Sequence, residues 1–288
     1  MNRLAMIDGV VHPLEHASVS VLDRGFLYGD SVFETIRTYD GVPHALGEHL
    51  ERLERSAGLV HIELPVPRAV FAQEIAESVR AAGNEESYIR AMVTRGSGEL
   101  GLDPSLAGKG LRVILVTPLA APPASLYESG IHVITHVTRR AADATPAAGA
   151  KIGNYLVSVL AIREAKARGA AEALIVDGEG RIVEGATSNV FFVRGGTLLT
   201  PPEGLGILPG ITRGAVLAVA ARLGMAVDFR APSVAEAAAF DEVFITSSIR
   251  ELLAVVQLDG APVSGGIPGP VYRRLLTAFR ASVRPVPG

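Results

Sequence analysis

Lysine is scarce in this chain, and it is the residue type whose amine can form a covalent bond with a carbonyl group. Of the 27 basic residues only Lys109, Lys151 and Lys166 are lysine, and the others are arginine. An arginine guanidinium stays protonated near neutral pH, whereas a lysine amine in a dry environment can lose its proton and form a Schiff base. Each of the three lysines is therefore a candidate nucleophile.

The sequence around Lys151 differs from that around the other two lysines. Lys109 stands in a Gly-Lys-Gly turn and Lys166 in a charged helical segment, settings that are typical of solvated side chains. Lys151 stands in Ala-Gly-Ala-Lys-Ile-Gly without an acidic neighbour, a setting in which burial would favour the neutral, reactive amine. A lysine that extends along the surface at a helix entry fits the same residues, so both interpretations stay open on composition alone.

Two segments of the second half could bind a phosphate group. Leu208–Arg213 contains a Pro-Gly turn before an apolar helix, and a helix start offers backbone N–H groups and the positive end of the helix dipole. Thr212 adds a hydroxyl, and the run Thr246-Ser247-Ser248 after a strand offers more. An ordinary helix cap and a hydroxyl-rich loop have the same appearance, so neither segment is specific by itself.

Glu184 is the candidate partner for a cationic ring nitrogen. It ends a predicted hairpin strand and is followed by Gly185. Most glutamates in such positions are exposed. If Glu184 is buried, it needs a cation, and the protonated nitrogen of a cofactor ring would supply one.

The elements that must position these residues follow from hydrophobic periodicity and from turn residues. The first part of the chain predicts strands at 4–7, 10–11, 32–38, 88–95 and 111–117 and helices at 48–59 and 70–82. The proline-rich segment PLAAPPAS (118–125) cannot pair inside a sheet and predicts a connector. The second part predicts strands at 131–137, 173–176, 181–184, 189–193, 197–200 and 242–246, a small-residue loop at 140–150, helices at 155–168 (capped by Asn154) and 212–223, and a frayed tail from Arg284.

Composition excludes several functional classes. The chain is 48% hydrophobic and carries a formal net charge of −3, so it can bury a core and has no basic surface for nucleic acid or an anionic membrane. The absence of cysteine removes disulfides, thiol catalysis and thiolate metal sites. No secretion signal or spanning segment is visible, so we expect a soluble, cytoplasmic protein without a metal site.

Taken together, these segments resemble the class IV aminotransferases, which use pyridoxal 5′-phosphate and have PLP fold type IV. The resemblance covers nearly the whole chain. Its motifs stand in the family's order: DRGFLYGDSVFE (23–34), HLERL (49–53), AK (150–151) with NY (154–155), EG (184–185) with NVF (189–191), and LPGITR (208–213). Each motif is weak alone, and the ordered series is a strong signal.

The resemblance implies a role for each motif. Lys151 would form the Schiff base with the cofactor and move a proton at the substrate's α-carbon. Glu184 would keep the pyridine nitrogen protonated, Tyr155 would bond the phenolic oxygen, and Leu208 would pack against the ring. The other implied cofactor-binding residues are Arg52, Asn189, Ile211, Thr212, Ser247 and Ser248.

The resemblance also implies an architecture. The expected fold is α/β (α+β) with two domains: a smaller N-terminal α/β domain (1–118), a linker (119–127) and a larger C-terminal pseudo-barrel domain that binds the cofactor (128–288). The family's pocket receives a loop from the partner subunit, so we expect a homodimer, and a higher oligomer is compatible with this expectation.

The strand at 88–95 carries the best local indication of the substrate. Tyr88 and Arg90 alternate to one face, where a phenol and a guanidinium could bind a carboxylate, although a partly exposed sheet face fits the spacing equally well. Tyr-Ile-Arg, followed by Arg95-Gly96 and by LGLDP (100–104), resembles the branched-chain enzymes. The residues expected to line the substrate pocket are Tyr28, Phe33, Tyr88, Arg90, Ile249 and Arg250.

Two departures from the branched-chain pattern keep alternatives open. Branched-chain enzymes usually carry an acidic residue at the place of Ser188 and small residues at the place of the segment 247–250, which here reads Ser-Ser-Ile-Arg. D-amino acid enzymes use an Arg-x-His carboxylate trap at the place of Leu100-Gly101-Leu102, which counts against that activity in its usual form.

We therefore expect a ping-pong transamination between a branched-chain L-amino acid and 2-oxoglutarate. The alternative is a D-amino acid or (R)-amine transaminase with a non-standard carboxylate pocket. An aminodeoxychorismate lyase, which eliminates pyruvate and needs no second keto acid, is the third possibility.

Overall fold

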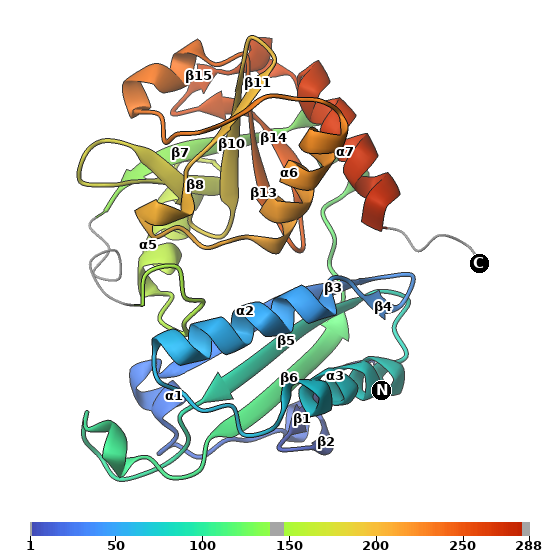
Figure 1. Cartoon of the computed structure of the whole chain (residues 1–288), viewed down its shortest axis with the longest axis vertical. Helices are drawn as coiled ribbons and strands as arrows, with labels where there is room; N and C mark the ends of the chain where they lie inside the picture. Colours follow the sequence, from blue (N-terminus) through green and yellow to red (C-terminus); the bar gives the residue numbers. More distant parts are fainter. Residues whose placement is uncertain (1, 139–146, 284–288) are drawn as a thin grey trace. The chain divides into compact units, whose positions relative to one another are not determined.

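The computed structural model describes residues 2–138 and 147–283, whose contacts divide into two compact units (Figure 1). Within these residues, unit 1 comprises 2–120 and 150–154, and unit 2 comprises 121–138, 147–149 and 155–283. The short segment 150–154 therefore packs with the first part of the chain although it follows the predicted connector. Residues 140–146 of the expected small-residue loop and the tail from Arg284 lie outside the described residues.

Unit 1 is built on a six-stranded antiparallel sheet with the order β2-β1-β6-β5-β3-β4. Its strands are β1 (Leu4–Ile7), β2 (Val10–Pro13), β3 (Ser31–Tyr39), β4 (Val42–Pro43), β5 (Ser87–Thr94) and β6 (Leu111–Pro118). Its helices are α1 (Arg24–Tyr28), α2 (Leu46–Leu59) and α3 (Arg68–Ala82), with 3-10 turns η1 (Leu14–His16) and η2 (Pro104–Leu106).

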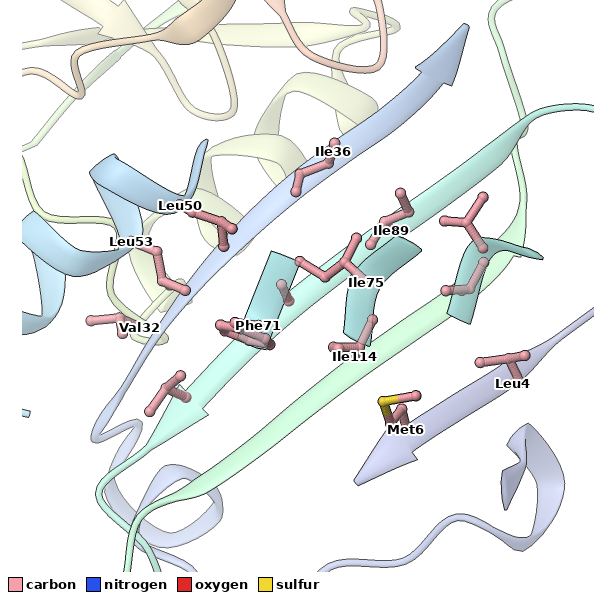
Figure 2. Packing of buried hydrophobic residues seen from close by; sticks show 14 of the residues in the cluster. Leu4, Met6, Val32, Ile36, Leu50, Leu53, Phe71, Ile75, Ile89 and Ile114 are labelled. Carbon is pink, nitrogen blue, oxygen red and sulfur yellow. The ribbon is translucent and has the colours of Figure 1, made fainter. Parts of the chain in front are cut away.

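The core of unit 1 lies between one face of this sheet and the helices α2 and α3. Figure 2 shows side chains of α2 and α3 packed against those of the strands, in a single cluster of buried residues. On β5 the alternating side chains of Ile89, Ala91 and Val93 are fully buried in this cluster. Tyr88 and Arg90 therefore point to the opposite face of the sheet, as the period of two requires.

Unit 2 is built on a larger, mixed sheet with the order β12-β11-β10-β13-β14-β7-β8-β9, and β15 pairs with β14. Its strands are β7 (Ile131–Val137), β8 (Glu172–Val176), β9 (Ile182–Gly185), β10 (Asn189–Arg194), β11 (Thr197–Thr200), β12 (Val227–Phe229), β13 (Glu242–Ser247), β14 (Glu251–Leu258) and β15 (Ala261–Pro262). A bridge between Gly185 and Ser188 joins the end of β9 to the start of β10, so the sheet curls toward a half-barrel. These two sheets confirm the predicted mixed α/β fold class.

The helices of unit 2 cover the curled sheet. They are α4 (Ala124–Ser129), α5 (Leu156–Ala167), α6 (Ile211–Arg222) and α7 (Pro270–Val283), with 3-10 turns η4 (Glu203–Leu205), η5 (Val234–Ala239) and η6 (Ser264–Gly266). The rings of Phe191 and Phe244 stack at 5.1 Å between β10 and β13, and Tyr272 of α7 lies against Phe244 at 6.2 Å. Aromatic packing thus joins the central strands to the C-terminal helix.

Two helix starts differ from the prediction. Asn154 was expected to cap the helix after Lys151, but α5 begins at Leu156 with Tyr155 as its N-cap and no side-chain cap. The reason is that the segment up to Asn154 is bound to unit 1, where Gly153 N–H donates to Ser31 O at 2.8 Å. The helix α2 begins two residues earlier than expected, because Ala45 adopts a left-handed conformation before it.

Two kinds of feature are absent from the described residues. None of their helices has both the length and the apolar character needed to cross a membrane. Within residues 2–138 and 147–283, no group of three or more His, Asp or Glu side chains could hold a metal ion.

Candidate active site

Lys151 is attached to unit 1 through its backbone. Its N–H donates to Ser56 Oγ of α2 at 3.1 Å, and its carbonyl accepts from the N–H of Phe33 in β3 at 3.0 Å. The half-buried side chain places Nζ 4.6 Å from the centre of the Phe33 ring. A helix and a strand of unit 1 therefore determine where this amine lies.

The residues after Lys151 run alongside β3. Ile152 forms an antiparallel bridge with Val32, and the next residue, Gly153, approaches Ser31 very closely. A Cβ atom at Gly153 would collide with Ser31 Oγ, so only glycine permits this approach. This contact explains why a glycine follows the lysine at this spacing.

Arg52, the expected phosphate-binding arginine, is buried on the face of α2 that meets β3. Its Nε and Nη2 donate to Glu34 of β3 at 2.8 and 2.6 Å. His49, one helical turn earlier, lies 2.7 Å from the same carboxylate through Nδ1. Because Ser56 lies one turn after Arg52, the same helix face holds both the Arg52 guanidinium and the backbone of Lys151.

The electrostatics of this group favour an ionised Glu34. Burial alone raises the pKa of the Glu34 carboxyl, but hydrogen bonds and charge from Arg52 and His49 outweigh it and lower the pKa to about 2. Burial lowers the pKa of His49 despite the neighbouring carboxylate. Since an ionised carboxylate only accepts hydrogen bonds, the Nδ1 of His49 must carry the proton that it shares with Glu34.

The expected substrate residues of unit 1 gather at Phe33. The Arg90 guanidinium lies 3.7 Å from the centre of the Phe33 ring, the same ring that Lys151 contacts. Arg90 Nε also contacts Met92 Sδ at 3.2 Å, and Tyr88 lies two residues before Arg90 on the same sheet face. The Arg90 guanidinium and the Lys151 amine therefore lie at the same aromatic ring, and a guanidinium in such a place can bind an anionic group.

Tyr28 lies at the end of α1, where its hydroxyl accepts from Gly101 N–H at 3.1 Å. The Arg24 guanidinium lies 5.1 Å from the Tyr28 ring and donates to the Gly101 carbonyl at 2.8 Å. Tyr28 therefore orders the loop that contains Leu100 and Leu102, in addition to its predicted place in the substrate pocket.

In unit 2 two side chains fix the turn before α6. Glu184, only 8% exposed, accepts from Leu208 N–H at 3.1 Å through Oε2. Asn189 donates from Nδ2 to the Leu208 carbonyl at 2.9 Å. A Cβ atom at Gly210 would collide with Asn189 Oδ1, which explains the glycine in this turn. Both the N–H and the carbonyl of Leu208 are thus hydrogen-bonded to side chains.

The start of α6 and a buried hydroxyl fit the phosphate group of the expected cofactor. The helix begins at Ile211 after Gly210, which supplies no side-chain cap, and Thr212 is buried in its first turn. Thr246 Oγ1 is buried without a hydrogen-bond partner among the described residues. Thr246 pairs with Asn189 across β13 and β10, so their side chains share a sheet face, and Asn189 contacts the turn before α6. An anion that accepts from these groups would satisfy the Thr246 hydroxyl.

Polar side chains of the segment after Thr246 form hydrogen bonds within unit 2. Ser247 Oγ accepts from the N–H and from Nε of Arg250 at 3.3 and 3.1 Å. The Arg250 guanidinium donates to Glu172 at 2.8 Å and to Thr187 Oγ1 at 2.7 Å. Ser248 and Ile249 are half-buried in the turn between them.

The predicted residues thus gather into two groups. Unit 1 holds Lys151, Arg52, Tyr28, Phe33, Tyr88 and Arg90, and unit 2 holds Tyr155, Glu184, Asn189, Leu208, Ile211, Thr212 and the segment 247–250. Sequence reasoning did not single out Ser56, His49 or Glu172, nor the role of Glu34 as the partner of Arg52. Glu34 and His49 lie inside quoted motifs, which was a usable signal, whereas Ser56 and Glu172 have no local signature.

Comparison with known proteins gives a consistent result. Residues 31–258 match the family model described as Amino-transferase class IV. The chain is 36% identical over 278 residues to the branched-chain-amino-acid aminotransferase of Escherichia coli (strain K12), covering 92% of this chain and 88% of that one. It is 30% identical over 280 residues to the D-alanine aminotransferase of Bacillus licheniformis, covering 96% of each chain.

Solved structures share the fold along nearly the whole chain. The crystal structure of the Escherichia coli branched-chain amino acid aminotransferase superposes with a TM-score of 0.92 at 33% identity, covering 98% of this chain and 94% of that chain. The T.th. branched-chain amino acid aminotransferase, complexed with N-(5′-phosphopyridoxyl)-L-glutamate, superposes with a TM-score of 0.90 at 34% identity. That match covers 97% of this chain and 93% of the other. Two further structures of the same enzyme contain pyridoxamine 5′-phosphate and 4-methylvaleric acid.

The lowered pKa of Glu34 predicts a pH dependence of stability. A carboxyl group whose pKa is lower in the folded state than the ordinary 4.5 stabilises the fold above pH 4.5, and this contribution is lost as the pH falls toward 2. The difference corresponds to about 3 kcal/mol. Glu34→Gln should therefore be less stable at pH 7, and its free energy of unfolding should change less than the wild type's between pH 5 and pH 2.

Urea unfolding followed by circular dichroism at each pH measures this effect. Glu48→Gln, an exposed change on the helix that carries Arg52, is the control and should retain the wild-type dependence. An unchanged pH dependence in Glu34→Gln would contradict the assignment.

Proposed function

The chain belongs to the class IV aminotransferases, and from this we propose that it transfers an amino group between a branched-chain L-amino acid and 2-oxoglutarate. Its cofactor is pyridoxal 5′-phosphate, and the two half-reactions follow a ping-pong mechanism. The similarity to enzymes with this activity extends over nearly the whole chain. The observation in this molecule that supports the proposal is the anchored Lys151, whose amine lies with Arg90 at the Phe33 ring.

Four residues are assigned to the ring of the cofactor. When bound, the cofactor supplies an electron-withdrawing pyridinium ring that stabilises negative charge at the substrate's α-carbon. Lys151 holds the cofactor covalently, and its Nζ removes and returns the proton at the α-carbon. Glu184 keeps the ring nitrogen protonated. Two observations support this role: the side chain is buried, and its carboxylate is fixed by the hydrogen bond from Leu208 N–H. Tyr155 binds the phenolic oxygen, and Leu208 packs on the ring.

The phosphate group is assigned to backbone and side-chain donors. The N–H groups at Ile211 and Thr212 and the Thr212 hydroxyl bind it from the helix start, and Arg52 adds a fixed positive charge. Ser247 and Ser248 stay in the predicted set, with Asn189 ordering the turn before the helix. Thr246 joins this set because its buried hydroxyl needs an acceptor.

Arg90 and Tyr88 are assigned to the substrate's acidic groups. Arg90 is held over Phe33, and its guanidinium can donate two parallel hydrogen bonds to the carboxylate of the acceptor. A structure of the T.th. relative is complexed with N-(5′-phosphopyridoxyl)-L-glutamate, which supports an acidic amino acid as one of the substrates. Phe33, Tyr28 and Ile249 belong to the same predicted pocket, for which the sequence also suggested Arg250.

A second activity has its own support. The similarity to a D-alanine aminotransferase over 96% of each chain keeps a D-amino acid or (R)-amine transaminase as the alternative. The segment Ser247-Ser248-Ile249-Arg250, which departs from the branched-chain pattern, is where such a preference would arise. The lyase remains the third prediction.

A homodimer is part of the proposal. Large apolar side chains are exposed on unit 1 at Leu100 and Leu102 (79% exposed), and on unit 2 along α5 at Leu156 and Val159. Exposed apolar clusters of this kind mark interaction surfaces. Light scattering at micromolar and lower concentrations tests the dimer, and a monomer that remains active at high dilution would contradict it.

The domain limits 1–118, 119–127 and 128–288 and the cytoplasmic location also stay predictions.

The visible spectrum of the protein mixed with pyridoxal 5′-phosphate tests the central assignment. We expect an absorbance band at roughly 410–420 nm, characteristic of a cofactor bound to lysine. Lys151→Ala should lose the band, and Lys166→Ala, which changes an exposed lysine of α5, should keep it. Retention of the band in Lys151→Ala would show that another group binds the cofactor.

The same band distinguishes the candidate substrates. L-leucine, D-alanine and (R)-1-phenylethylamine are added separately without a keto acid. Loss of the band with L-leucine supports the branched-chain activity. If only D-alanine or the amine removes the band, the D-amino acid or (R)-amine activity replaces the branched-chain activity.

Thr246→Val separates cofactor binding from folding. The hydroxyl has no partner among the described residues, so its removal should leave the thermal midpoint of the cofactor-free protein unchanged or higher. The dissociation constant of pyridoxal 5′-phosphate should rise by roughly tenfold or more, because a hydrogen bond to a charged group is lost.

Thr200→Val is the matched control in the same unit. Its hydroxyl donates to Val190 O at 3.0 Å, so its removal should lower the thermal midpoint. An unchanged cofactor affinity in Thr246→Val would remove Thr246 from the site.

A further inference from the structure

Glu172 is an acidic residue with no access to solvent. It is 0% exposed at the start of β8. Its Oε1 accepts from Ala173 N–H at 3.1 Å, and its Oε2 accepts from Thr187 Oγ1 at 2.7 Å and from Arg250 Nη2 at 2.8 Å. Among the residues that the structure describes, Arg250 is the one basic side chain paired with it.

Arg250 connects Glu172 to two turns of unit 2. It ends the turn 247–250 between β13 and β14, where its N–H and Nε donate to Ser247 Oγ. Its Nη2 also donates to the carbonyl and the hydroxyl of Thr187, in the turn 185–188 between β9 and β10. One guanidinium therefore joins its own turn to Glu172 and to the turn 185–188, which lie 78 and 63 residues earlier in the sequence.

These two turns carry groups that are assigned to the cofactor. Glu184 comes directly before the turn 185–188, and Asn189 directly follows it. Thr246 comes directly before the turn 247–250. A buried carboxylate that loses its cationic partner is strongly destabilising, so the pairing constrains both turns.

We infer that Arg250 is a positioning residue, which pairs with Glu172 and holds the turns 185–188 and 247–250 in place, and that it does not bind the substrate's carboxylate. This differs from the expectation that Arg250 lines the substrate pocket. The part of the inference that concerns the cofactor rests on the proposed function, whereas the coupling of the two turns does not. The inference is supported by the hydrogen bonds of Arg250, which go to Ser247, Glu172 and Thr187 of the same unit.

The coupling is tested in the cofactor-free full chain with Arg250→Met, Glu172→Gln and the double variant. Loss of one partner of a buried pair should lower the thermal midpoint by roughly 6–20 °C. The double variant should lose much less than the sum of the two single losses, because no unpaired charge remains. Arg168→Met is the control, since it removes an arginine from the more exposed pair with Asp259.

Hydrogen exchange shows whether the turns respond. Amides at 185–189 and 246–250 should exchange faster in Arg250→Met and at the wild-type rate in Arg168→Met. Additive losses of stability in the double variant, or unchanged exchange at both turns, would overturn the inference. These measurements need neither substrate nor cofactor.

Ligand binding separates a positioning residue from a substrate ligand. If Arg250 positions the turns, Arg250→Met should raise the dissociation constant of pyridoxal 5′-phosphate by roughly tenfold. It should change the affinity of the cofactor-saturated protein for 4-methylvaleric acid by less than about twofold, because no hydrogen bond to that carboxylate is lost.

The opposite pattern, with unchanged cofactor affinity and a large loss of carboxylate affinity, would make Arg250 a substrate ligand. If the wild type bound no pyridoxal 5′-phosphate, the proposed function would fail. The stability and exchange measurements would still decide the inference.

Discussion

The buried ion pair between Glu34 and Arg52 joins the two elements on which the amine of Lys151 depends. Glu34 is 0% exposed and lies next to Phe33 in β3, whose N–H binds the Lys151 carbonyl. Arg52 lies one turn before Ser56 in α2, whose hydroxyl binds the Lys151 N–H. Because a buried carboxylate must keep its donors, the strand and the helix cannot separate without a large cost in free energy. The position of the lysine backbone follows from this constraint.

In unit 2, polar side chains likewise hold turns in place. The backbone of Leu208 is held by the side chains of Glu184 and Asn189, and two further turns are joined by Arg250. Side chains that bind the backbone of a turn reduce its freedom before any ligand arrives. A group such as the Thr246 hydroxyl then keeps its position without a partner of its own among the described residues. Preorganisation of this kind favours binding of a small anionic ligand.

The unequal use of arginine and lysine has a physical reason in this chain. Arg52 and Arg250 are paired with buried carboxylates, which need a charge that persists at every physiological pH and a planar group that donates several hydrogen bonds. Lys151 instead contacts an aromatic ring and has small residues around it in the sequence. An amine that must become neutral to react cannot also serve as the permanent partner of a buried acid. The scarcity of lysine in the amino-acid sequence therefore narrows the candidate nucleophiles to three residues.

Most of the fold, and the family to which the chain belongs, could be predicted from the sequence. Alternation placed Tyr88 and Arg90 on the sheet face opposite Ile89, and the ordered motifs indicated the family. These features are local, since they depend on residues within one strand, turn or helix.

The partners of those residues were decided only by the tertiary structure. Lys151 and Ser56 are 95 residues apart, and Arg250 and Glu172 are 78 residues apart. A contact over such separations leaves no periodicity or spacing in the sequence. The same holds for the segment 150–154, which packs with unit 1 because Gly153 can approach Ser31 closely. The sequence by itself thus determined the family and the candidate residues, and tertiary packing decided which groups hold those residues in place, since packing is set by contacts between residues distant along the chain.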